Sequence, residues 1–272
     1  MRLHAIGFPC EMDSRTAEFI VRVAKAPRQR VTAARGDYLV WHSRVGAEIW
    51  LHYPTRRTDR RSSWPDAGKL QKPFDPIDDL MGMTVVHSGM SDLRTHLVRT
   101  LATAPENPMD GIGIATLGSR RAGDKPLTFT FELVSYATER LLRPADVRLR
   151  VTALAQRVWA HPTVAAYLAA TPARRLIACG GIADVTPADL PDLALIYKPK
   201  PGALWLLSGT VRRSMRLVNP ITSAPYYLIV LETDRGLFDV VANPAAIEGD
   251  ISDGHVMQVV ASVSGRVLER IG

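Results

Sequence analysis

The clearest fold signal in the chain is the stretch Tyr226-Tyr-Leu-Ile-Val-Leu-Glu-Thr-Asp-Arg-Gly-Leu-Phe-Asp-Val-Val-Ala242. Its apolar residues predict one strand from Tyr226 to Thr233 and a second strand from Leu237 to Ala242. The intervening Asp234-Arg235-Gly236 predicts a tight turn, because glycine accepts the positive φ that such turns need. This stretch therefore predicts an antiparallel hairpin.

Strand signals continue on both sides of this hairpin. Before it, Leu204 to Leu217 predicts a long strand interrupted by Gly209, followed by a turn at Asn219-Pro220. After it, Asn243 to Gly254 predicts a connecting loop or short helix, and His255 to Leu268 predicts a final strand. Three meandering strands, a connector and a closing strand are the pattern of a small OB-like barrel.

The barrel predicted over residues 203–272 needs one strand more than this pattern supplies. Glycines inside strands suit the bulges at which a small barrel bends. Either a break at Gly265 divides the last strand into two, or another part of the chain completes the sheet.

Residues 1–202 predict a β-rich unit with few helices. Residues 92–101 fit a helical stripe and one face of a strand equally well, and periodicity does not decide between them. The fold class expected for the whole chain is α+β, predominantly β, with this unit followed by the OB-like barrel. The other expected elements are a helix over 13–26, strands over 38–41, 48–53, 83–87, 127–133 and 147–153, and a short helix from Pro162 to Ala170.

The formal net charge of +7 is concentrated near the N-terminus. Residues 1–63 hold 12 Arg and Lys against 6 Asp and Glu, whereas residues 203–272 hold 6 Arg against 7 Asp and Glu. Basic clusters attract phosphate groups, so Arg56, Arg57, Arg60 and Arg61 are candidate phosphate-binding residues. A GC-rich genome would also produce this bias, since Arg outnumbers Lys 28 to 6.

Composition narrows the class of protein. No apolar run is long enough to predict a membrane-spanning helix, and the first residues lack the apolar core of a signal peptide. Cys10 and Cys179 are too few for a disulfide framework or a four-cysteine zinc site. We therefore expect a cytoplasmic protein with no membrane partner.

Several short motifs resemble those of a family of uncharacterised bacterial proteins. They are Gly46-Ala-Glu-Ile-Trp50, Val151-Thr-Ala-Leu-Ala155, Ser208-Gly-Thr-Val211, Leu231-Glu-Thr233, Asp239-Val-Val-Ala242 and Gly265-Arg-Val267. The resemblance implies a β-rich protein that ends in a barrel-like unit, and it implies no catalytic residue.

Arginines and tyrosines on neighbouring strands form a candidate ligand-binding face. Arg212, Arg213 and Arg216 lie on the first predicted barrel strand, and Tyr226 and Tyr227 lie on the second. Exposed rings of this kind stack on nucleobases while guanidinium groups hold phosphates. The alternative is that the rings fill the barrel and the arginines are solvated, and the balanced charge of residues 203–272 favours it.

The chain also offers scattered residues for catalysis. Glu48, His87 and His96 could line a pocket of the N-terminal unit, but no metal-binding or nucleophile motif connects them. The glycine-rich stretch 111–118 lacks the spacing of a dinucleotide fingerprint and predicts a small-residue strand. No cofactor and no metal are expected.

Three functions follow from these observations. The first is a non-enzymatic binding protein whose barrel faces a small molecule or a protein, with weak nucleic-acid binding led by the N-terminal arginines. The second is an enzyme with a pocket around Glu48, His87 and His96. The third is a component that pairs exposed barrel edges into a homo-oligomer.

Overall fold

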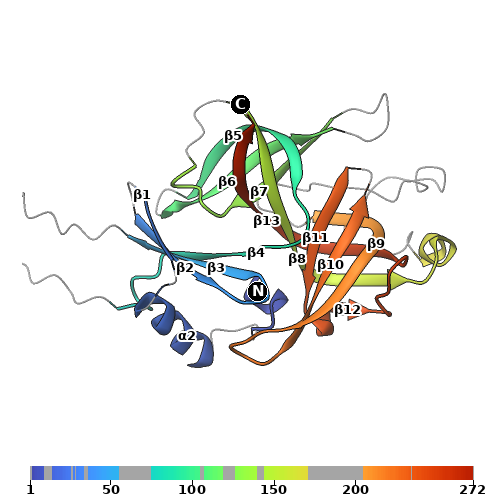
Figure 1. The fold of residues 1–272 in the computed structure, drawn as a ribbon, viewed down its shortest axis with the longest axis horizontal. Coiled ribbons are helices and arrows are strands. Elements are labelled where there is room, and N and C mark those ends of the chain that lie inside the picture. The colour runs from blue at the N-terminus through green and yellow to red at the C-terminus, as the bar shows by residue number, and fades with distance from the viewer. Residues whose placement is uncertain are drawn as a thin grey trace, which may run out of the picture.

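The chain folds into a small antiparallel sheet and a large sheet, which confirms the expected α+β, mainly β class (Figure 1). The computed structural model describes residues 2–8, 14–25, 27, 29–33, 36–54, 75–104, 107–118, 126–139, 144–170, 205–233 and 235–271. In the described part of the chain, no helix is long and apolar enough to cross a membrane.

The N-terminal sheet contains four antiparallel strands in the order β1-β2-β3-β4. One of its faces packs on the helix α2, which buries Phe19, Ile20 and Val23 and so confirms the helix predicted here. The elements of this region are α1 (Arg2–Ala5), α2 (Ser14–Lys25), β1 (Gln29–Ala33), β2 (Gly36–His42), β3 (Ala47–Pro54) and β4 (Gly82–His87).

The second sheet contains nine strands and is folded on itself. Its strands are β5 (Leu93–Ala104), β6 (Asn107–Leu117), β7 (Leu127–Leu133), β8 (Ala145–His161), β9 (Trp205–Val218), β10 (Pro225–Thr233), β11 (Gly236–Ala242), β12 (Ile247–Glu248) and β13 (Val256–Ile271). A short helix over 164–170 follows β8, and a 3₁₀ turn, Pro244–Ala246, precedes β12.

Strand pairing closes this sheet into two five-stranded rings. Barrel A is the ring β5-β6-β7-β13-β8, and barrel B is the ring β9-β10-β11-β8-β13. The strands β8 and β13 pair with each other along most of their length and pass from one barrel into the other (Figure 1). Neither barrel is therefore complete without a strand from the other half of the chain.

The two barrels have equivalent strand pairings. The strand β8 is antiparallel to β5 through residues 145–149 in barrel A and parallel to β11 through residues 152–154 in barrel B. The strand β13 is antiparallel to β9 through residues 256–261 in barrel B and parallel to β7 at residues 264–265 in barrel A. The pair Thr152 and Ser264 lies at the centre of this exchange, since Thr152 is opposite Asp239 of β11 and Ser264 is opposite Glu132 of β7.

The hairpin predicted around Arg235-Gly236 is confirmed, because Thr233 is opposite Gly236 and the strands pair through to Tyr227 and Ala242. The missing barrel strand comes from elsewhere in the chain: β8 completes barrel B, so residues 203–272 do not close it alone. Gly265 does not interrupt the last strand, since it pairs with Val151. Residues 92–101 form part of a strand, β5, because they pair with β6 on one side and β8 on the other.

The N-terminal sheet packs against both barrels. Ile49 and Leu51 share a hydrophobic cluster with Tyr226 and Leu228 of barrel B. Trp50, on the opposite face of β3, shares another cluster with Met109 of β6 in barrel A. The edge strand β4 meets the junction of the barrels, where Ser264 Oγ donates to Val85 O at 2.5 Å and His87 N donates to Thr152 Oγ1 at 3.1 Å.

Candidate functional site

The three arginines of the expected ligand face are all exposed on β9. The Arg212 guanidinium makes an ion pair with Glu232 of the neighbouring strand β10. No ion pair or hydrogen bond joins the side chains of Arg213 and Arg216 to the described residues. Two free guanidinium groups therefore remain on the surface of barrel B.

The two tyrosines that were expected on this ligand face point to opposite sides of β10. Tyr226 has no exposed surface, and its hydroxyl lies 3.4 Å from His87 Nε2. Tyr227 is half-buried, lies opposite Arg216 and packs against the interior cluster of barrel B. A ring without exposed surface cannot stack on a nucleobase, so the ligand-facing role expected for Tyr226 is corrected to a core role.

The chain itself covers the face of barrel B that carries Tyr226. Asn219 Nδ2 donates to Ile6 O at 2.7 Å, and Thr222 Oγ1 donates to Gly7 O at the same distance. Asn243 Nδ2 donates to His4 O at 3.3 Å. These bonds fasten the N-terminal segment to the β9–β10 turn and to the end of β11, so the part of this face around Tyr226 is closed to a ligand.

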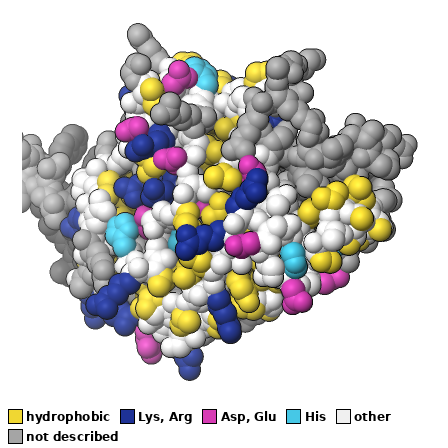
Figure 2. All heavy atoms as spheres, turned by 45° about the vertical axis from the view of Figure 1, so that its right-hand side comes forward, with side chains coloured by type: hydrophobic (Ala, Val, Ile, Leu, Met, Phe, Trp, Pro, Cys, Tyr) yellow, Lys and Arg dark blue, Asp and Glu magenta, His cyan; other side chains and the backbone are white. Residues whose placement is uncertain are grey.

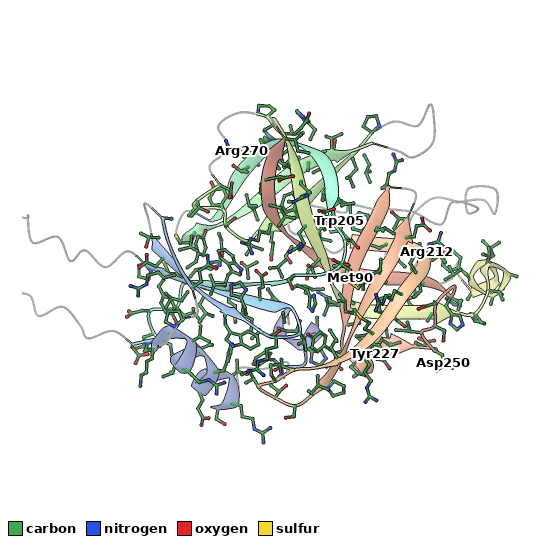
Figure 3. All side chains as sticks on the ribbon, in the orientation of Figure 1. Met90, Trp205, Arg212, Tyr227, Asp250 and Arg270 are labelled. Carbon is green, nitrogen blue, oxygen red and sulfur yellow. The ribbon has the colours of Figure 1, made fainter. Side chains whose placement is uncertain are left out.

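The remaining surface of barrel B carries both signs of charge. Figure 3 marks Arg212, Tyr227 and Asp250 on this barrel. Glu248, Asp250 and Asp253 are exposed on the connector that precedes β13, and the carboxylate of Asp253 accepts a hydrogen bond from Ser214 N on β9. Figure 2 shows basic and acidic side chains interspersed on the face it displays, instead of one continuous basic patch.

The predicted phosphate-binding arginines Arg56, Arg57, Arg60 and Arg61 lie outside the described residues.

The residues expected for an enzymatic pocket lie in three separate environments. Glu48 and His87 project from opposite faces of the N-terminal sheet, because His87 packs with the Tyr226 side and Glu48 shares its face with Trp50. His96 lies exposed on β5 of barrel A, where its Nδ1 is 2.7 Å from Asp146 Oδ1. The three side chains do not converge on one pocket.

The carboxylate of Glu48 is buried, and its charge is balanced by an ion pair and a hydrogen bond. Its Oε2 lies 3.2 Å from the Arg266 guanidinium and accepts a hydrogen bond of 3.2 Å from Trp50 Nε1. Arg266 also lies over the Trp50 ring, 5.5 Å from its centroid. A buried carboxylate that is paired and hydrogen-bonded is a structural group joining β3 to β13.

His87 is held as a neutral imidazole. Burial, aided by the positive charge of Arg150, lowers the pKa of His87 to about 4. Its Nδ1 accepts a hydrogen bond from Gly89 N at 3.0 Å, which leaves Nε2 to carry the proton facing Tyr226. Burial also raises the pKa of Tyr226. His87 and Tyr226 therefore pack against each other between β4 and barrel B.

Two arrangements of buried polar side chains were not predicted from the sequence. Asp239, with no exposed surface, accepts hydrogen bonds from Met90 N, Ser91 N and Ser91 Oγ, and burial raises its pKa. The signal for it was a lone carboxylate between Phe238 and Val240 in an otherwise apolar strand. Its partners are about 150 residues away in the chain, so the sequence pattern could not reveal them.

The second arrangement is a chain of polar atoms through His52. Thr84 Oγ1 lies 3.2 Å from His52 Nε2, and His52 Nδ1 lies 2.6 Å from Asp110 Oδ1. The order of hydroxyl, imidazole and carboxylate is that of a nucleophile relay. Thr84 and His52 are only 4% and 1% exposed, so a substrate cannot reach the hydroxyl in this structure.

Among the residues that the structure describes, no group of three or more His, Cys, Asp and Glu side chains could hold a metal ion. A small hollow lies where the two barrels meet, lined by Ile112, Thr130, Phe131, Glu132, Trp205, Ser262 and Val263. Glu132 is the one ionisable residue in this lining, and Phe131 and Trp205 belong to the hydrophobic core, so the hollow does not pair a general acid with a general base.

No family model, no curated protein and no solved structure matches this chain.

Proposed function

We propose that the protein is a non-enzymatic binding protein and that barrel B binds an acidic protein partner through β9. The single observation that supports this proposal is that Arg213 and Arg216 are exposed and without an ion partner among the described residues; they lie opposite Val230 and Tyr227, so they project from the two sides of β9 and flank the strand. Exposed charges of this kind steer and orient a partner of opposite charge. The candidate catalytic groups Glu48 and His87, in contrast, are buried and bonded within the chain.

The interpretation of barrel B as an OB-like barrel also favours β9 as the binding surface. OB-like barrels bind ligands on the face of their second and third strands and through the loop that joins the first two. In barrel B these parts are β10, β11 and the turn at 219–224, which the N-terminal segment covers. The arginines of β9 are then the exposed groups best suited to contact a partner.

Protein is favoured over nucleic acid as the partner for two reasons. The aromatic residues Trp205, Tyr226 and Phe238 are all buried, so of the expected stacking rings only Tyr227 is partly accessible. Acidic residues also lie among the arginines, as at the rim of a protein interface. We expect this binding to occur in the cytoplasm, which the low cysteine content favours.

A fluorescently labelled glutamate-rich peptide is a direct probe of this proposal. We expect weak, salt-sensitive binding in fluorescence anisotropy, reduced about tenfold or more by the double variant Arg213→Glu/Arg216→Glu, which corresponds to roughly 1.4 kcal/mol. The matched control is Arg22→Glu/Arg99→Glu, which makes the same change in net charge at exposed positions outside barrel B.

Equal binding by both double variants would contradict the proposed surface, because the effect would then follow net charge alone. Tighter binding of a single-stranded oligonucleotide than of the peptide, lost in Arg213→Glu/Arg216→Glu, would move the partner class to nucleic acid. No binding of either probe to the unmodified protein would remove the support for an anionic partner.

A further inference from the structure

In the described part of the chain, β1 has one unpaired edge, and it lies far from barrel B (Figure 1). In the N-terminal sheet β1 is the outermost strand and pairs only with β2. The rings of barrels A and B, in contrast, are closed by pairing within the chain. Figure 1 shows β1 at the periphery of the molecule, on the side remote from barrel B.

The register of the hairpin identifies the backbone groups at this edge. Ala33 is opposite Gly36, and two residues separate them in the sequence, which makes them a hydrogen-bonded pair. Because such pairs alternate along an antiparallel ladder, Val31 also faces β2 with its N–H and C=O, whereas Arg30 and Thr32 direct theirs outward. No described hydrogen bond occupies these outward groups.

One face of β1 is apolar and half-buried, and the other face is polar and exposed. Val31 and Ala33 are half-buried and pack against the cluster that contains Tyr38 and Trp50. Arg30 and Thr32 are exposed on the opposite face. An added strand could therefore continue both the apolar face and the solvated face of the sheet.

We propose that a second copy of this chain pairs with β1, antiparallel and centred on Val31. In this register Val31 lies opposite Val31 of the other copy, and Arg30 lies opposite Thr32. All of the residues from Gln29 to Ala33 take part, and the two four-stranded sheets become one continuous sheet. No like charges face each other directly.

Charge and length select this register over its neighbours. Centring the pair on Arg30 would place two guanidinium groups opposite each other, which destabilises a sheet pair. Centring it on Thr32 would leave only the residues from Val31 to Ala33 paired. The strand also has no proline, and it is not interrupted by a bulge, two of the devices that block edge pairing in other proteins.

A disulfide trap tests the register on the full-length chain. In a Cys10→Ser/Cys179→Ser background, Val31→Cys should form a covalent dimer on mild oxidation, because Cβ atoms of directly opposed residues lie within disulfide range. Thr32→Cys is the matched control, since residue 32 of one copy lies diagonal to residue 32 of the other and too far for a disulfide. Failure of Val31→Cys to cross-link, or equal cross-linking by both variants, would overturn the proposal.

Light scattering on the unmodified chain provides the second test. At about 100 µM, where a small edge interface should be occupied, we expect a concentration-dependent mass that approaches twice 29.9 kDa. Thr32→Pro removes only an outward N–H and should leave a monomer with an unchanged circular dichroism spectrum. Thr32→Val retains that N–H and should still dimerise. A monomeric unmodified chain, or a Thr32→Pro variant that is folded and still dimeric, would overturn the proposed edge.

Discussion

His87 links the N-terminal sheet to barrel B, and its protonation opposes folding. Burial lowers its pKa to about 4, whereas an unfolded histidine titrates near pH 6.5. Between these two pH values the unfolded chain binds a proton that the folded chain does not. The free energy of unfolding should therefore fall as the pH drops from 6.5 to 4, by about 3 kcal/mol at most from this residue.

Urea unfolding at several pH values, with His87→Gln as the comparison, measures this contribution. The glutamine variant retains polar contacts but cannot titrate, so its stability should decrease less over the same pH interval. The difference between the two proteins isolates His87 from Asp239, whose raised pKa acts in the opposite direction by favouring the folded state as the pH falls. Parallel pH profiles for the two proteins would show that His87 does not titrate as described.

At the residue scale, the sequence predicted that the arginines of β9 are exposed, but it did not predict which residues contact the neighbouring side chains. The exposure of Arg212, Arg213 and Arg216 agrees with their expected place on the barrel surface. The opposite orientations of Tyr226 and Tyr227 follow from strand alternation, but Tyr226 is buried because the N-terminal segment, about 220 residues earlier in the chain, covers its side of the barrel. No local pattern could identify that cover.

At the element scale, the β10–β11 hairpin was predictable because its cause is local. Gly236 has φ of 137°, a region that residues with a side chain rarely adopt. A Cβ there would also lie 2.9 Å from Leu93 Cδ2 of β5. The turn therefore depends on glycine for both its backbone conformation and its contact with barrel A.

Gly236→Val should destabilise the protein by about 1–3 kcal/mol, since it combines an unfavourable φ with a close contact. Gly118→Ala is the control, because a Cβ at Gly118 meets nothing within 4 Å and its backbone is not in the positive-φ region. Both changes can be measured by thermal or urea unfolding. A Gly236→Val variant as stable as Gly118→Ala would contradict this account of the turn.

Other elements were predictable in type but not in extent. Residues 92–101 fit two periodicities, and only pairing with β6 and β8 makes them part of a strand. The first half of β8 was expected from the alternation of Val147, Leu149 and Val151 against polar neighbours. Its continuation to His161 belongs to a second barrel, where Leu154 and Ala155 are both buried and the alternation disappears.

At the scale of the whole molecule, the exchange of β8 and β13 decides the architecture. Each strand supplies one segment to barrel A and another to barrel B. The closing contacts, Glu132 opposite Ser264 and Asp239 opposite Thr152, join parts of the chain more than 80 residues apart. Such pairings leave no signal in local periodicity, which is why the sequence predicted a barrel at 203–272 without its closing strand.

The exchange also has an energetic consequence. Loss of β8 would open both rings, and so would loss of β13. The N-terminal sheet reinforces this connection through Ser264 and Thr152, whose hydroxyl groups bond to β4. We therefore expect the two barrels to unfold in one cooperative step, unlike two domains joined only by a linker.

Pulsed hydrogen exchange with mass spectrometry across a urea series tests this claim most directly on the intact chain. Peptides from β7, which belongs only to barrel A, and from β11, which belongs only to barrel B, report the two rings separately. The interlocked architecture predicts that both peptides lose protection at the same urea concentration. Separate midpoints, with one peptide protected while the other exchanges, would contradict it.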